Sequence, residues 1–411
     1  MTAQPGPAPT TGARFRDSAF VTSLTDLRAR VRGGNLGSIP VVIGLVVIWV
    51  IFQLLNPSFL SSSNLVNLTL QCAAVGTIAI GIVLVLLVGQ IDLSVGSVSG
   101  LAGAIVAVGL TQLGWGLALS IVVALAAGVA IGLLYGFLFT RFGVPSFIIT
   151  LAGLLAVLGL QLEVLGSTGS INIPFDSVIV QFATTWFLPP WAAYLLAAVG
   201  AGSMLLADVL RRRRRERAGL SVGSIVGPAL RAGVLFALMS IAVWYLATDR
   251  GVAVVFVFFV LLVVLVNFML TRTRWGRNVY AVGGSVEAAR RAGIRVDRIY
   301  VSVFVLCSTF AVIGGILATA KLTSATLLSG AGDTNLNAIA AAVIGGTSLF
   351  GGRGSAWSAL LGIFVIQSIS NGLTLLNLDS SVRYIITGGV LLLAVIIDSL
   401  SRRSRASHGQ A

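Results

Sequence analysis

The sequence predicts an all-α fold, a polytopic bundle of transmembrane helices with the N and C termini in the cytoplasm. Composition is the first reason, because 57% of the 411 residues are hydrophobic, only 10% are charged, and the mean hydropathy is +1.01. Soluble domains contain roughly 25% charged residues, so a soluble fold of this length could not bury so much apolar surface. A series of long apolar runs and the grouping of basic residues between them are the other two reasons.

The apolar runs place about 12 spans (10–12) along the chain, since a bilayer-spanning helix needs about 20 mostly apolar residues. They lie near 39–56, 65–88, 93–113, 115–140, 145–165, 186–208, 228–247, 250–270, 299–320, 335–351, 355–376 and 382–399. The runs at 65–88 and 335–351 meet glycine-rich sequence, so a broken or re-entrant span is an open alternative there. The spans define one transmembrane domain over 39–399.

The basic residues orient these spans. With both termini inside, 24 of the 27 basic residues fall on the cytoplasmic side, and only Arg250, Lys321 and Arg383 fall outside. Leaving out any one central span would destroy this positive-inside pattern. The net charge of +14 therefore reflects membrane orientation, and we expect no nucleic-acid partner.

The two ends of the chain are polar. Residues 1–38 contain Pro5, Pro7, Pro9 and five arginines without an apolar run, which predicts a disordered cytoplasmic tail without a removable signal peptide. An amphipathic helix at the membrane surface over residues 14–32 is the alternative. Residues 400–411 form a second cytoplasmic tail.

Residue types that carry catalysis or bind metals are scarce. The only histidine, His408, lies in the C-terminal tail, and the two cysteines, Cys72 and Cys307, fall inside apolar spans. The sequence contains no G-x-x-x-x-G-K-[ST] phosphate loop. We therefore predict no catalytic residue, no metal site and no cofactor, and the chain is not expected to be an enzyme by itself.

Residues 271–298 form the longest polar stretch between spans, on the cytoplasmic side. Ser285 is a good N-cap after the Gly283–Gly284 turn, Glu287 lies in the first helical turn, and Gly293 suits the C′ position. The residues between these caps make a helix of roughly 10 Å. A helix that docks a cytoplasmic partner and a helix that lies on lipid headgroups both fit this pattern.

This loop resembles the coupling loop of ABC importer permeases. Glu287, Ala288, Ala289 and Gly293 match their E-A-A-x-x-x-G motif, and G-R-N-V-Y-A-V-G-G-S-V-E-A-A-R-R-A-G-I resembles the sugar branch with the ribose and xylose permeases. In that family the short helix sits in a cleft of the ATPase subunit. The resemblance implies that the residues coupling this chain to an ABC ATPase subunit are Gly283, Gly284, Ser285, Glu287, Ala288, Ala289 and Gly293.

A second segment, V-G-Q-I-D-L-S-V-G-S at residues 88–97, is similar to the family's G-G-I-D-L-S-V-G-S. It carries Asp92 at the junction of two apolar spans, where a carboxylate near the bilayer centre costs about 2.5 to 3.5 kcal/mol. One interpretation makes Asp92 an N-cap of the next helix, with hydroxyls bonding backbone carbonyls. The other, which can coexist with it, places the segment beside a sugar path formed by Gly89, Asp92, Ser94, Gly96 and Ser97.

Two further segments are candidates for the same path. Residues 345–355 repeat the spacing of Gly89, Leu93 and Gly96 at an offset of 256 residues, which nominates Gly345, Gly346 and Thr347. Close helix packing also explains such glycines. Residues 142–153 match the family's V-P-x-F-I-x-T-L, and their Ser146 and Thr150 share a helix face, where they line a polar path or bond back to their own helix.

The resemblance, over residues 64–165 and 271–398, implies the permease subunit of a bacterial ABC importer that moves a monosaccharide across the plasma (inner) membrane. It implies as partners an ABC ATPase subunit, an extracytoplasmic sugar-binding protein and a second permease copy forming a homodimer, all at the lipid bilayer. The extra length between 170 and 250 resembles xylose-type members, so xylose or another pentose is the expected substrate.

Two other functions are weighed against this one. An ABC permease for branched-chain amino acids or another small solute has the same architecture. An ion-coupled secondary transporter usually buries several ionisable residues, whereas here Asp92 and Glu163 are nearly the only candidates.

Overall fold

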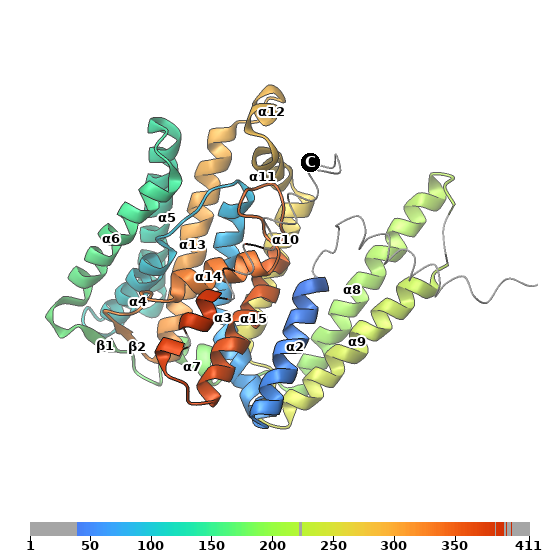
Figure 1. Ribbon diagram of the computed structural model, residues 1–411, viewed down its shortest axis with the longest axis horizontal. Coiled ribbons are helices and arrows are strands. Elements are labelled where there is room, and N and C mark those ends of the chain that lie inside the picture. The colour runs from blue at the N-terminus through green and yellow to red at the C-terminus, as the bar shows by residue number, and fades with distance from the viewer. Residues whose placement is uncertain (1–38, 222–223, 383, 390–391, 393–395, 397–411) are drawn as a thin grey trace, which may run out of the picture.

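The computed structural model describes residues 39–221, 224–382, 384–389, 392 and 396, and they form an all-α bundle (Figure 1). The two predicted tails and much of the last predicted span lie outside these residues. The helices include α2 (Ile39–Leu55), α3 (Ser62–Leu87), α4 (Val95–Thr111), α5 (Leu117–Phe142), α6 (Ser146–Leu165), α7 (Val178–Thr184), α8 (Pro190–Arg217), α9 (Val226–Ala247), α10 (Val254–Arg272), α11 (Arg274–Gly284), α12 (Val286–Arg291), α13 (Val296–Leu322), α14 (Thr334–Ile344) and α15 (Ala356–Leu375).

The predicted multi-pass helical fold is confirmed. Within the described residues, eight helices are long and apolar enough to cross a membrane, namely α3, α5, α6, α8, α9, α10, α13 and α15. The apolar helices α2, α4 and α14 are shorter. Each of the first eleven predicted spans contains one of these helices.

Helix α3 is the centre of the bundle and is continuous, so the broken span considered over 65–88 does not occur. Ser61 caps its first turn by accepting a hydrogen bond from the Asn64 backbone. Most of its residues are buried against α13, α15, α14 and α10. A helix that is apolar on all sides suits this enclosed position.

In contrast to α3, two segments of the bundle lose helical structure: residues 88–94 before α4 and residues 345–355 after α14. We call these the interrupted crossings. Over 335–351 the broken alternative is confirmed, because α14 ends at Ile344 and does not continue as a single helix. Its 11 residues extend about 16 Å, well short of the ~30 Å hydrocarbon core. Residues 345–355 continue without helix, with positive φ at Gly346, Gly351 and Gly352. Residues 88–94, which follow α3, are also not helical, and α4 begins at Val95.

The two ends of the bundle differ in character. Helices α11 and α12 and the arginine-rich end of α8 lie at one end, at the top of Figure 1. The strands β1 (Ser170–Asn172) and β2 (Ser324–Thr326), paired antiparallel, lie at the other end with α7. The positive-inside rule predicts that the basic end faces the cytoplasm, so we call it the cytoplasmic end and the opposite end the outer end.

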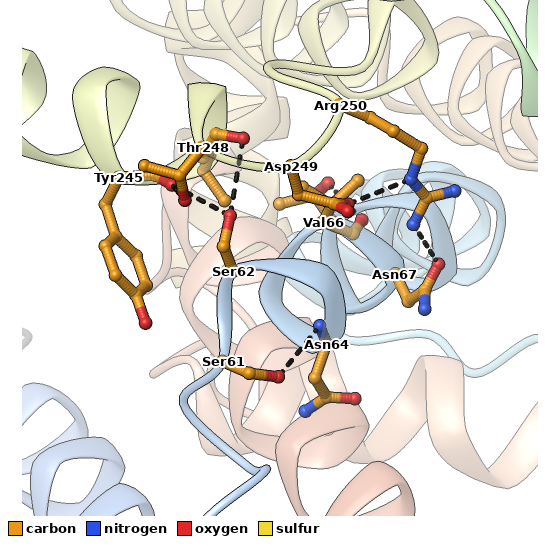
Figure 2. A network of polar contacts seen from close by, with 11 residues as sticks. Ser61, Ser62, Asn64, Val66, Asn67, Tyr245, Thr248, Asp249 and Arg250 are labelled. Atoms are coloured by element: carbon orange, nitrogen blue, oxygen red, sulfur yellow. Dashed lines mark hydrogen bonds and ion pairs between the residues drawn. The ribbon is translucent and has the colours of Figure 1, made fainter.

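Helices α8 and α9 form a hairpin at the edge of the bundle (Figure 1). Polar contacts tie its outer end to the start of α3 (Figure 2). Ser62 Oγ donates to the Tyr245 carbonyl at 2.8 Å, and Arg250 donates to Asn67 Oδ1 at 2.7 Å and pairs with Asp249 at 3.0 Å. Elsewhere the hairpin exposes large apolar side chains such as Trp244, which suit contact with lipid.

Candidate functional site

The short helix α12 projects from the cytoplasmic end (Figure 1). Ser285 is its N-cap, and the side-chain oxygen accepts a hydrogen bond from the Ala288 backbone N–H at 3.3 Å. Gly293 lies just beyond its last turn with φ +79, the left-handed conformation that ends many helices. Both predicted caps are therefore present. Glu287 and Ala288 are exposed, whereas Ala289 is buried and anchors the helix to the bundle.

Helix α11 supports α12 and was not predicted. Thr273 caps its N-terminus by accepting from the Gly276 backbone at 3.1 Å. Two hydrogen bonds fasten it to the bundle: Trp275 Nε1 donates to Ser302 Oγ of α13 at 2.9 Å, and Tyr280 donates to the Gly354 carbonyl at 2.9 Å. Burial raises the pKa of the Tyr280 phenol further above neutrality, so the phenol remains a donor here. These contacts give α12 a rigid base.

The end of α11 meets both interrupted crossings at one glycine-rich contact, which we call the glycine junction and define as Gly89, Gly283, Gly351 and Gly352. The Gly352 N–H donates to the Leu87 carbonyl at the end of α3 at 2.8 Å. A side chain on Gly283 would clash with that same carbonyl and with the Gly352 nitrogen. A side chain on Gly351 would meet the backbone of Gly89 and Gly283. Backbones this close leave no room for any residue but glycine.

Residues 88–94 run past the first turn of α6, and that turn supplies hydrogen-bond partners for them. The Leu93 N–H donates to Thr150 Oγ1 at 3.1 Å, and the Ile91 N–H donates to Ser146 Oγ at 3.4 Å. Both hydroxyls are buried. Non-helical backbone inside a membrane is tolerated only when its polar groups are satisfied by protein or a water-filled cavity. Ser146 and Thr150 therefore stabilise the interruption between α3 and α4.

Asp92 lies in this segment and is fully buried. Its Oδ1 accepts two hydrogen bonds from Ser94, one from the backbone at 2.8 Å and one from the hydroxyl at 2.7 Å. Ser97 Oγ donates to the Ser94 carbonyl at 2.9 Å. The interpretation of Asp92 as the N-cap is therefore wrong: Ser94 is the N-cap residue of α4, no side chain caps the helix there, and only the Ser97 hydroxyl makes the expected bond to a backbone carbonyl. The second carboxylate oxygen, Oδ2, has no hydrogen-bond partner among the described residues, and the Cys307 thiol lies beside the carboxylate.

The spacing shared by the two glycine segments does not reflect one repeated conformation. Gly89 has φ +72, whereas its counterpart Gly345 is right-handed helical. Gly96 lies within α4, whereas its counterpart Gly352 has φ +72. Gly345 packs on the Ser358 backbone of α15, Gly346 has φ +102, and Thr347 is buried with its hydroxyl unpartnered among the described residues.

A cavity of about 450 Å³, lined by polar and apolar residues, opens in the outer half of the bundle, and we call it the outer cavity. Small-molecule sites commonly enclose roughly 300–1,000 Å³. Its long polar side chains are Gln71 of α3, Lys321 of α13 and Gln367 of α15, and Asp333 lies at the start of α14. Its hydroxyl-bearing residues are Ser99, Thr319, Thr326, Ser329 and Thr334.

Helix α4 connects the interrupted crossing to the wall of this cavity. Ser99 lines the cavity directly, and the Gly96 N–H donates to Asn335 Oδ1 just after the cavity-lining segment. Gln161 of α6 donates to the Thr326 and Ser329 carbonyls, both at 3.0 Å, and holds that segment in place. None of the path residues nominated from the sequence lines the cavity; they lie in or beside the two interrupted crossings. Sequence reasoning missed Gln71, Lys321 and Gln367, although each interrupts or ends an apolar run.

A protein-family model matches most of the chain. It is the model of the family described as "Branched-chain amino acid transport system / permease component", and it matches residues 64–395. The chain belongs to this permease family. The match begins at α3 and includes both interrupted crossings and α11–α12.

Curated relatives narrow the resemblance to sugar permeases. The xylose transport system permease protein XylH of Escherichia coli K12 is 35% identical over 370 residues, which are 90% of this chain and 93% of that protein. XylH of Haemophilus influenzae is 33% identical over 91% of this chain and 99% of its own length. The ribose import permease protein RbsC of E. coli K12 is 32% identical over 87% of this chain and 92% of its own length. No solved structure matches the chain significantly.

Proposed function

We propose that this chain is the transmembrane permease subunit of an ABC importer that moves a monosaccharide across a bacterial plasma (inner) membrane, with ATP hydrolysed on a separate subunit. Xylose or another pentose is the substrate that the relatives favour, because XylH proteins are 33–35% identical over at least 90% of the chain. The proposed partners are an ABC ATPase subunit, an extracytoplasmic sugar-binding protein and a second permease copy.

The observation that carries this proposal is the placement of α12. It exposes Glu287 and Ala288 at the cytoplasmic end, where a partner can dock. Its base, α11, ends at the glycine junction, where both interrupted crossings meet. A displacement of α12 by an ATPase would therefore act on the two least regular parts of the membrane domain.

The same geometry suggests how the movement reaches the solute. Residues 88–94 lead from the glycine junction into α4, and α4 contributes Ser99 to the outer cavity. Residues 345–355 lead back to α14, whose first residue Thr334 also lines that cavity. Closure of the ATPase would thus reach the outer cavity through two helices that are not anchored as continuous spans.

The test is uptake in proteoliposomes that contain the chain, its genetically neighbouring ATPase and the neighbouring binding protein. We expect radiolabelled D-xylose to accumulate only with ATP inside the compartment that holds the ATPase, and collapse of ion gradients to leave uptake intact. Uptake by the chain alone, driven by an ion gradient, would overturn the proposal. Accumulation of L-leucine in place of D-xylose would favour the amino-acid function that the family description names.

A further inference from the structure

The outer cavity concentrates polar groups that have no partner. Gln71, Lys321 and Gln367 are half-buried, and their side chains make no hydrogen bond or ion pair with any residue that the structure describes. The same holds for the carboxylate of Asp333, which is exposed. Their donors and acceptors face one cavity and are unpaired among the described residues, so a polar solute in the cavity can bond them.

Lys321 is the most informative of these residues. It is the only lysine in the whole sequence, and it lies in the last turn of α13, a membrane-spanning helix. Lysines at the ends of such helices commonly extend to the membrane interface, whereas Lys321 lines the outer cavity. The ion pairs that the structure contains among its described residues lie elsewhere, on α8 and at Asp249–Arg250. The Lys321 ammonium is therefore available to a molecule in the cavity.

The lining also indicates the chemistry of that molecule. One ammonium and one carboxylate, not paired with each other, leave the cavity without net charge, which suits a solute without net charge, either a polyhydroxyl compound or a zwitterion such as an amino acid. Two carboxamides offer donors and acceptors together, as hydroxyl groups do. Much of the remaining wall is small, formed by Ala74, Gly315, Ala318, Gly330 and Ala331.

We propose that the outer cavity is a binding site for a neutral polyhydroxyl solute, with Lys321, Gln71 and Gln367 as its principal hydrogen-bonding residues. The proposal rests on the sugar-importer function proposed above and extends it by naming residues that contact the solute. Lys321 donates from its ammonium to solute hydroxyl oxygens, and the two glutamines bracket the solute from α3 and α15.

The single lysine gives a direct test on the full-length protein. Reductive methylation with ¹³C-formaldehyde labels Lys321 as a dimethylammonium that keeps its charge, and otherwise labels only the N-terminal amine. A Lys321→Met variant assigns its resonance. D-xylose and D-ribose are then titrated separately to about 100 mM, since a transport site binds weakly enough to release its solute.

We expect either sugar to shift the Lys321 resonance saturably and L-leucine to leave it unchanged. Gln367→Leu should raise the sugar concentration at half-saturation about tenfold, the loss of affinity expected for one hydrogen bond in a partly buried site. Gln112→Leu is the matched control, because Gln112 follows α4 at its outer end and does not line the cavity. Its titration should match that of the wild type.

Three results would overturn the proposal: no saturable shift with either sugar, a saturable shift with L-leucine instead, or equal weakening by Gln367→Leu and Gln112→Leu. These outcomes are separable from the importer function. The titration uses the chain without its ATPase, so a sugar-dependent shift in a protein that binds no ATPase would retain the cavity assignment and reject the importer. A protein that couples to the ATPase but shows no shift would retain the importer function and reject the cavity assignment.

Discussion

At the scale of single residues, two hydroxyl groups hold the interruption between α3 and α4 in place. Thr150 Oγ1 accepts from the Leu93 backbone and donates to the Ser146 carbonyl at 3.0 Å of its own helix. Part of its role was visible in the sequence, because Ser146 and Thr150 share a face and bonding back to the helix was one alternative. Its hydrogen bond with the Leu93 backbone could not be predicted from the sequence, because Leu93 lies 57 residues away in the chain.

Thr150→Val tests this role. Valine keeps the shape and removes the acceptor, so the Leu93 N–H loses its partner in a buried site. We expect a loss of about 1–3 kcal/mol of stability, measured as a lower midpoint in detergent denaturation of the purified protein. Thr150→Ser, which keeps the hydroxyl, should lie close to the wild type; a valine variant as stable as the serine variant would contradict the assignment.

The neighbouring glycines Gly283 and Gly284 offer a second test at this scale. A Cβ on Gly283 would collide with backbone atoms of Leu87 and Gly352, whereas a Cβ on Gly284 would meet nothing within 4 Å. Overpacking of this kind costs about 1–3 kcal/mol. Gly283→Ala should therefore lower ATP-driven uptake and stability, and Gly284→Ala should lower neither. Equal tolerance of both alanines would show that the close approach at the glycine junction is not required.

At the scale of elements, only part of the structure of the loop at residues 271–298 could be predicted from the sequence. The caps of α12 follow from Ser285 and Gly293, residue types with strong positional preference. Helix α11 was missed, although buried Val279 and Val282 with partly buried Trp275 supply a helical spacing. The shortened α14 could be suspected from its glycines, but its end at Ile344 depends on the packing of residues 345–352 against α3 and α11.

The cap of α12 can be tested by substitution at Ser285. Ser285→Ala removes the oxygen that accepts from Ala288, which should cost roughly 0.5–2 kcal/mol in a helix of only six residues. We expect weaker retention of the ATPase during purification, while Ser285→Asn, which can cap equally well, should retain it. Loss of the ATPase in the asparagine variant as well would mean that the serine acts by direct contact and not as a cap.

At the scale of the whole molecule, composition and arginine placement were sufficient for the multi-pass fold, because the bilayer imposes span length and orientation on any sequence. They could not reveal the outer cavity, since Gln71, Lys321, Asp333 and Gln367 come together only when α3, α13, α14 and α15 pack. Lys321 in particular counted as one of three exceptions to the cytoplasmic grouping of basic residues. In the structure, the same residue lines the cavity.

The central claim is that α12 docks an ATPase, and the most direct measurement is co-purification of the chain with the ATPase encoded beside it. The variants to compare are the wild type, Glu287→Arg and Glu216→Arg. Glu216 is an exposed residue at the same end of the molecule, on α8, and its pairing with Arg212 is a surface ion pair of little energetic weight. The wild type and Glu216→Arg should retain an active ATPase, and Glu287→Arg should lose it. Retention by all three variants, or by none, would contradict the account.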